Sequence, residues 1–329
     1  MDFRLPAYVL FISLGMLIGV FMNNVPVRSA FALSAMVMDT LPSNTPTGVL
    51  PDEPDTTEYI VARTQTPASF MTRNVAFVSE FIKRLNYQRT PDNQPMDSVN
   101  RQLYLREPYL RELFDQDDAR LNPRSPSYSL AYKTTVDDFV TDVVRDTASV
   151  FLPDAHEQLF AQVEYTVRFR DTTLPATLYL KRFRNGRAYD WKILDSENRL
   201  PTGRRRQSVA SRADSVPNLF IASETHETRF LNLLGHMRSR RNLLQLMPVG
   251  QPVSPALRAL AEGVSDSTVT VERTASVHLF LNTHRNWVLQ LDDFVRAKDN
   301  SGWLITNLYG GTSPAKLPHP IAQYLKQTN

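Results

Sequence analysis

The side chains best suited to chemistry in this 329-residue chain are acids and aromatic residues on alternating, strand-like segments. A carboxyl group buried among aromatic rings has a raised pKa and can act as a general base. Asp293 fits this pattern, because it has the strand parity of Trp287 and Leu291. The candidate ligand-pocket residues are Tyr165, Tyr179, Trp191, Asp195, Trp287, Asp293 and Trp303. The alternative is that the aromatic rings belong to the core and the acids lie at strand ends.

The residue types and their spacing do not indicate thiol, metal, phosphate-binding or dinucleotide-binding chemistry. The chain has no cysteine, which excludes disulfides, thiol nucleophiles and thiolate zinc sites. None of the six histidines has a partner at i, i+4, so we expect surface or capping histidines, no metal and no cofactor. A phosphate-binding glycine loop, a nucleophile elbow and a dinucleotide fingerprint are all absent from the sequence.

The same order of elements occurs twice, with amphipathic helices before long alternating strands. In the first copy, Thr66-Pro67 is typical of a helix start, and apolar residues at helical spacing predict a helix over 136–145. Thr135 and Asp138 there resemble a capping box. Alternation predicts three strands, over 163–169, 178–183 and 190–194. Asn185-Gly186 predicts a hairpin between the last two.

The second copy predicts a helix over 224–240 and another that begins at Ser254-Pro255 and ends near Gly263. Alternation predicts three further strands, over 269–281, 287–297 and 303–308. The first of these is long for a strand, so we expect strong twist or a bulge. In both copies the last strand opens on a tryptophan, Trp191 or Trp303.

The sequence therefore predicts an α+β fold of two tandem units, each with helices packed on a curved, cone-like antiparallel sheet. The predicted parts are a first domain at 67–195, an arginine-rich linker at 196–217, a second domain at 218–312 and a C-terminal tail at 313–329.

The amino-terminal residues are typical of a membrane segment. Leu5 to Met22 contains 18 residues without a charge, near the lower limit for a membrane-spanning helix. Residues 1–30 are therefore a signal anchor, or a signal peptide cleaved near Ala30-Phe31-Ala32. The proline- and threonine-rich acidic stretch 31–66 is typical of a spacer. We expect domains outside the cytoplasm, on the periplasmic side, or a secreted protein if the segment is cleaved.

The positive charge is concentrated in the linker. Its five arginines stand against two acids, which equals the net charge of +3 for the whole chain. The folded parts are therefore close to neutral, and nucleic acid is not an expected partner. Arg204-Arg205-Arg206 is typical of a solvated linker.

The order of elements resembles the nuclear transport factor 2-like superfamily, also described as cystatin-like or SnoaL-like. The resemblance rests on the strand pairs around LYLKRF–NG–YDWKI and FVRAKD–SGWLI and covers about two-thirds of the chain as two copies. It implies helices packed into the concave side of a bent sheet, around a cone-shaped cavity. Enzymes of the superfamily place an acid and a tyrosine in that cone, whereas many members are non-catalytic.

We expect a non-enzymatic, membrane-tethered binding or scaffold protein, with a protein partner or self-association. A small apolar ligand in one cone is a further partner to consider. One alternative is an assembly subunit for envelope secretion or conjugation, since such inner-membrane subunits carry one span before a periplasmic domain of this superfamily. Another is an isomerase- or hydrolase-like enzyme that uses an acid in one cone.

Overall fold

The computed structural model describes residues 75–146, 151–152, 155–202, 219–283, 287–296, 300–311, 313 and 315–328. The predicted membrane segment, the spacer, the Thr66-Pro67 helix start and Arg204-Arg205-Arg206 lie outside these residues. None of the helices in the described ranges has the length and apolar character needed to span a membrane.

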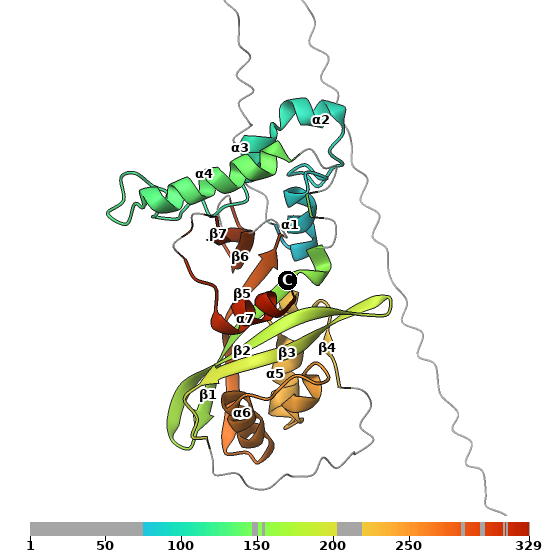
Figure 1. The fold of residues 1–329 in the computed structure, drawn as a ribbon, viewed down its shortest axis with the longest axis vertical. Helices are drawn as coiled ribbons and strands as arrows, with labels where there is room; N and C mark the ends of the chain where they lie inside the picture. Colours follow the sequence, from blue (N-terminus) through green and yellow to red (C-terminus); the bar gives the residue numbers. More distant parts are fainter. Residues whose placement is uncertain are drawn as a thin grey trace, which may run out of the picture. The chain divides into compact units, whose positions relative to one another are not determined.

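Seven antiparallel strands form one sheet in the order β4-β3-β2-β1-β5-β6-β7 (Figure 1). The strands are β1 (Leu159–Phe169), β2 (Thr172–Asn185), β3 (Ala188–Asn198), β4 (Ile221–Ala222), β5 (Val269–Asn282), β6 (Trp287–Phe294) and β7 (Gly302–Gly310). With the helices described below, this makes the chain an α+β protein, as the sequence predicts.

The two predicted sheets are a single sheet, because their first strands pair edge to edge. β1 and β5 pair antiparallel from Leu159↔Leu281 to Phe169↔Val269. The pairing shifts register twice within 164–167, which confirms the irregularity expected for so long a strand. Pairing at this junction satisfies backbone groups that two separate sheets would leave at open edges. The strand order is consequently mirrored about the junction, with β1-β2-β3 on one side and β5-β6-β7 on the other.

The α-helices are α1 (Val78–Leu85), α2 (Ser98–Leu103), α3 (Arg106–Arg111), α4 (Leu130–Arg145), α5 (Leu231–Arg238), α6 (Pro255–Ser265) and α7 (His319–Thr328). In the described ranges, the short 3-10 helices are η2 (Ala155–Glu157), η3 (Thr225–Thr228) and η4 (Leu243–Leu246). α7 lies in the segment predicted only as a tail.

Local sequence signals explain several of these boundaries. The Ser254 hydroxyl accepts from the Leu257 amide with Pro255 in the first turn, as predicted. α4 begins earlier than predicted, because the Ser129 hydroxyl caps it. Thr135 therefore lies inside α4 rather than at its start, and its hydroxyl donates to the Ala131 carbonyl.

Two glycines were predicted to mark local features: Gly186 a hairpin and Gly263 the end of a helix. The first prediction is confirmed and the second is wrong. Gly186 has φ of +62° in the hairpin between β2 and β3, as Asn185-Gly186 predicts. Gly263 does not end α6, which continues to Ser265. A Cβ at Gly263 would lie 2.5 Å from Val269 Cγ2, so this glycine is required for close packing of α6 on β5.

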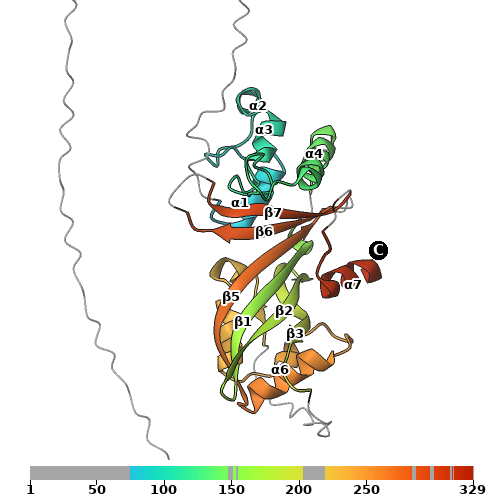
Figure 2. The same ribbon diagram turned by 90° about the vertical axis from the view of Figure 1, so that its left-hand side faces the viewer.

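Helices α1, α4 and α6 contact strands of the opposite copy, which differs from the predicted arrangement, whereas α5 contacts β4 and β5 of its own copy. From the first copy, Phe139 of α4 meets Trp287 of β6 with 5.7 Å between ring centroids, and α1 contacts β7. From the second copy, α6 contacts β3 as well as β5. Figure 1 and Figure 2 both place α1 and α4 beside β6 and β7 and place α6 beside β3. An amphipathic helix buries its apolar side against an apolar sheet face. The pattern of apolar residues in the helix does not specify which strands form that face.

One large core follows from this exchange. A continuous cluster of buried residues runs from α1 and α4 through β1, β2, β3, β5, β6 and β7 to α5 and α6. The opposite sheet face carries a smaller cluster, where Phe160, Tyr179 and Phe280 contact α7 through Ile321 and Tyr324. The two copies thus fold as one body in the described residues.

Candidate functional site

The best candidate site is the short segment 223–227, which follows β4. Here the single helix predicted over 224–240 is two helices, η3 and α5. They are separated by Arg229 and Phe230, whose φ values of 51° and 57° are left-handed. The break turns Glu224, His226 and Glu227 away from the axis of α5 and toward the sheet.

Tryptophans from both copies bind this segment. The Trp191 indole Nε1 on β3 donates to the Ser223 carbonyl oxygen at 2.9 Å. The Trp303 indole Nε1 on β7 donates to Glu227 Oε2 at 3.2 Å. The segment is therefore the place where the last strand of each copy is tied to the other.

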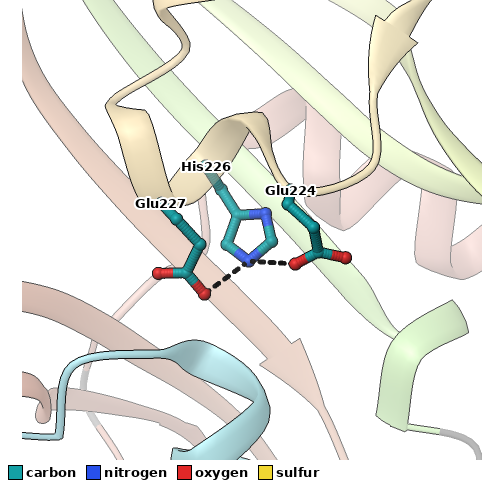
Figure 3. A group of neighbouring side chains, drawn as sticks. All are labelled: Glu224, His226 and Glu227. Atoms are coloured by element: carbon teal, nitrogen blue, oxygen red, sulfur yellow. Dashed lines mark ion pairs between the residues drawn. The ribbon is translucent and has the colours of Figure 1, made fainter. Parts of the chain in front are cut away.

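His226 lies at the centre of the segment and is only 1 % exposed. Its Nδ1 is 3.1 Å from the Ser223 carbonyl oxygen, which can only accept, so Nδ1 carries the proton. Its Nε2 faces Glu227 Oε1 at 3.2 Å and Glu224 Oε2 at 3.9 Å (Figure 3). This orientation corrects the expectation of surface or capping histidines.

Both carboxylates are held by groups on other elements. The Val78 amide at the start of α1 donates to Glu227 Oε1 at 2.8 Å. Arg182 on β2 donates through Nη2 to Glu224 Oε1 at 2.9 Å. Glu227 is 13 % exposed and Glu224 65 % exposed, so the cluster opens to solvent on the Glu224 side.

A second layer surrounds Arg182, which is almost fully buried. Burial lowers the pKa of Arg182, and the neighbouring Glu224 carboxylate opposes that change. His156 Nδ1 lies 3.4 Å from Arg182 Nη1, and burial together with this guanidinium lowers the pKa of His156. The Arg182 side chain also lies over the ring of Tyr189. Arg182 of β2 therefore balances the charge on Glu224.

The arrangement can do two things chemically. A doubly protonated His226 could bridge the two carboxylates as a buried ion pair. A singly protonated His226 would instead present the Nε2 lone pair beside two carboxylate oxygens, the donor types that bind divalent transition ions. The three donor atoms lie within 4.8 Å of one another.

The predicted aromatic candidates are mostly core residues. Tyr165, Trp191, Trp287 and Trp303 are between 0 % and 3 % exposed and pack in the large cluster. The Trp287 indole donates to Asp142 Oδ2 of α4 at 3.0 Å. Among the described residues, the Tyr165 hydroxyl has no hydrogen-bond partner, and burial raises its pKa well above the usual range.

Two other candidate pocket residues, Tyr179 and Asp195, do not lie with the buried aromatic candidates. Tyr179 lies on the α7 side of the sheet and donates to Glu197 Oε2 at 2.9 Å. Asp195 accepts from the Ser254 hydroxyl and from the Ser196 amide, so it supports the start of α6. The structure thus places these two residues apart from the tryptophans.

Asp293 is exposed, whereas its strand parity predicts the dry face. The register shift between β6 and β7 places its extra residue, Thr306, on β7, so Asp293 keeps the parity of the buried Leu291. Asp293 is exposed because it lies next to the end of β6, which is the alternative of an acid at a strand end. Partial burial still raises the pKa of Asp293; the nearby Arg229 opposes this and Glu227 adds to it. Asp293 therefore lies near the 223–227 segment, at its solvent side.

Sequence reasoning missed a polar network on the α7 side of β5, β6 and β7. His278 Nδ1 is 2.5 Å from Asp292 Oδ1, and Asp292 Oδ2 accepts from Thr306 at 2.5 Å. The Asp292 hydrogen bond raises the pKa of His278 and outweighs the effect of burial. The sequence does not give the register between β5, β6 and β7, so it could not show that His278, Asp292 and Thr306 lie side by side.

Comparison with known proteins adds no relative. No protein-family model, no curated protein and no solved structure matches the chain.

Proposed function

We propose that this chain is a membrane-tethered protein whose folded part lies outside the cytoplasm and binds a protein partner without catalysing a reaction. The observation that carries the binding role is the surface of α2, which buries none of its residues. Val99 and Leu103 are 63 % and 50 % exposed, and Leu105 just beyond the helix is 54 % exposed. Figure 1 and Figure 2 place α2 beyond α3, away from the sheet.

The spacing of these side chains is that of a binding face. Val99 and Leu103 are four residues apart, so they project from the same side of the helix. Exposed apolar side chains that share one side of a helix are typical of protein–protein contact. Arg101 and Arg106 lie close by, over the ring of Tyr87, and supply a charged rim.

The use of the candidate pocket residues also favours binding over catalysis. The indoles of Trp191, Trp287 and Trp303 donate to partners within the fold. Asp195 supports a helix start and Asp293 is exposed, so neither acid sits in an apolar pocket. The enzyme alternative retains one supporting observation, the partnerless hydroxyl of Tyr165 in the core.

The tether rests on the 18 uncharged residues from Leu5 to Met22, and on the spacer after them. A tethered binding protein of this plan would suit an envelope secretion or conjugation assembly, which we keep as the specific alternative. We also infer that the halves are related copies resembling the nuclear transport factor 2-like superfamily. The mirrored strand order supports that inference.

The tether is tested by fractionation of cells that make the full chain. We expect it to stay in the membrane pellet after alkaline extraction, and to be degraded by protease added outside the cytoplasmic membrane. Release of the intact chain into the soluble fraction, or protection from protease, would contradict the placement.

Binding is tested by site-specific photo-crosslinking in intact membranes. Photo-reactive residues at positions 99 and 103 should give one discrete adduct, and Leu103→Asp should abolish the adduct formed from position 99. Position 249 is the matched control, because Val249 is fully exposed in a loop far along the chain. Equal adduct yields from positions 99, 103 and 249 would refute a specific binding face on α2.

A further inference from the structure

The geometry of the 223–227 segment points to a metal site: we infer that Glu224, His226 and Glu227 bind one divalent first-row transition ion. The donor atoms are Glu224 Oε2, His226 Nε2 and Glu227 Oε1, and Figure 3 shows both carboxylates facing the His226 nitrogen. Imidazole nitrogen with carboxylate oxygen suits zinc and manganese among such ions. This inference does not depend on the proposed binding role.

Each ligand is held by a hydrogen bond on its other polar atom. His226 donates from Nδ1 to Ser223, which leaves the Nε2 lone pair for an ion. Arg182 holds Glu224 through Oε1 and leaves Oε2. Trp303 holds Glu227 through Oε2, and Oε1 accepts from the Val78 amide while keeping a second lone pair for an ion. Orientation of ligands by such outer partners is characteristic of metal sites.

The separations between donor atoms suit an ion of ordinary size. Ligands at about 2.0–2.2 Å from a tetrahedral ion lie about 3.3–3.6 Å from one another. His226 Nε2 and Glu227 Oε1 are 3.2 Å apart, and His226 Nε2 and Glu224 Oε2 are 3.9 Å apart. Glu224 needs only a small movement, and its exposed side chain has the freedom to make it.

The charges favour a cation and set its route of entry. Two carboxylates face one guanidinium, so the cluster has one net negative charge when His226 is neutral. His226 is buried, whereas Glu224 is largely exposed. An ion would therefore enter past Glu224, and solvent on that side can supply the remaining ligand.

The competing arrangement is a metal-free imidazolium between the two carboxylates. It uses the same contacts but places a proton on Nε2, where an ion would bind. Transition ions and protons then compete for the same nitrogen. Direct measurement of ion binding separates the two arrangements.

The test uses the full-length chain in detergent, freed of metal with a chelator and dialysed. Zn²⁺ binding is followed by calorimetry and by the metal content after gel filtration, with Mn²⁺ and Mg²⁺ in parallel. We expect one Zn²⁺ per chain, weaker Mn²⁺ binding in accord with the order of affinities for divalent ions, and no comparable Mg²⁺ binding.

The variant Glu224→Gln removes one ligand at an exposed position, so the fold should be retained. It should weaken Zn²⁺ binding by about tenfold or more. Glu262→Gln is the matched control, since Glu262 is an exposed acid on α6, and it should bind as the unaltered chain does. Binding by Glu224→Gln as tight as by Glu262→Gln, or no uptake of one equivalent, would overturn the site.

A second readout does not rely on a variant. Co²⁺ bound in place of Zn²⁺ should shift the ring protons of His226 far from their normal NMR positions, because the unpaired electrons reach a directly bonded imidazole. Shifts on other histidines with none on His226 would also overturn the inference.

Discussion

Replacement of Glu227 by glutamine gives the sharpest test of the 223–227 segment. The carboxylate accepts from the Val78 amide through Oε1 and from the Trp303 indole through Oε2. An amide has one acceptor oxygen and one donor nitrogen. Glu227→Gln can therefore satisfy only one of the two donors, and it turns its own NH₂ group toward the other.

The cost follows from these two bonds. A buried donor left without an acceptor costs about 1–3 kcal/mol, and the retained bond weakens because its acceptor is no longer charged. Together these effects predict that the free energy of unfolding falls by about 2–4 kcal/mol. For a domain of this size, the midpoint of thermal unfolding should fall by about 5–15 °C.

The measurement is urea unfolding followed by tryptophan fluorescence, with a chelator present so that metal binding does not contribute. Glu262→Gln makes the same chemical change on the exposed surface of α6 and should alter the free energy by less than about 0.5 kcal/mol. If Glu227→Gln matched this control, the reasoning that Glu227 joins α1 to β7 would be refuted.

Three further predictions concern stability. Because the pKa of His278 is raised in the folded state, its contribution is complete below the unfolded pKa of about 6.5 and is lost as pH rises through the folded value. The unfolding free energy should therefore fall from pH 6 to pH 8, and less so in His278→Asn or Asp292→Asn; an unchanged slope in both variants would contradict the pairing. Gly263→Ala should destabilise by about 1–3 kcal/mol, since its Cβ would meet Val269, and a neutral result in urea unfolding would show that α6 can move away. Ser254→Ala should cost about 1 kcal/mol through loss of the α6 cap, and calorimetric unfolding that is unaltered would show that the cap is dispensable.

Local sequence patterns were sufficient for most individual elements. Alternation over 163–169 identifies the carboxyl-terminal part of β1, and Ser254-Pro255 identifies the start of α6. Asn185-Gly186 identifies the hairpin between β2 and β3. These features depend on residues close in sequence, which is why the sequence alone could predict them.

Arrangement and site depend on contacts that are distant in sequence. The edges of β1 and β5 have no side-chain signal that distinguishes pairing with each other from pairing within separate sheets. The left-handed Arg229 and Phe230 are not residue types that predict a break, so His226 was expected in a regular helix. Asp293 has the parity of the buried Leu291 but lies next to the end of β6, where the strand reaches solvent, and parity alone does not locate that end.

The exchange of helices between the two copies is tested most directly by NMR on the tryptophan indoles. The chain has three tryptophans, so their indole N–H signals can be assigned by single substitutions to phenylalanine. Trp191 should show cross-relaxation with the ring of Phe230, 5.3 Å away between centroids, and Trp287 with the ring of Phe139. Two independent tandem units would instead place Trp191 beside α4 and Trp287 beside α5 or α6, and that pattern would contradict the exchanged fold.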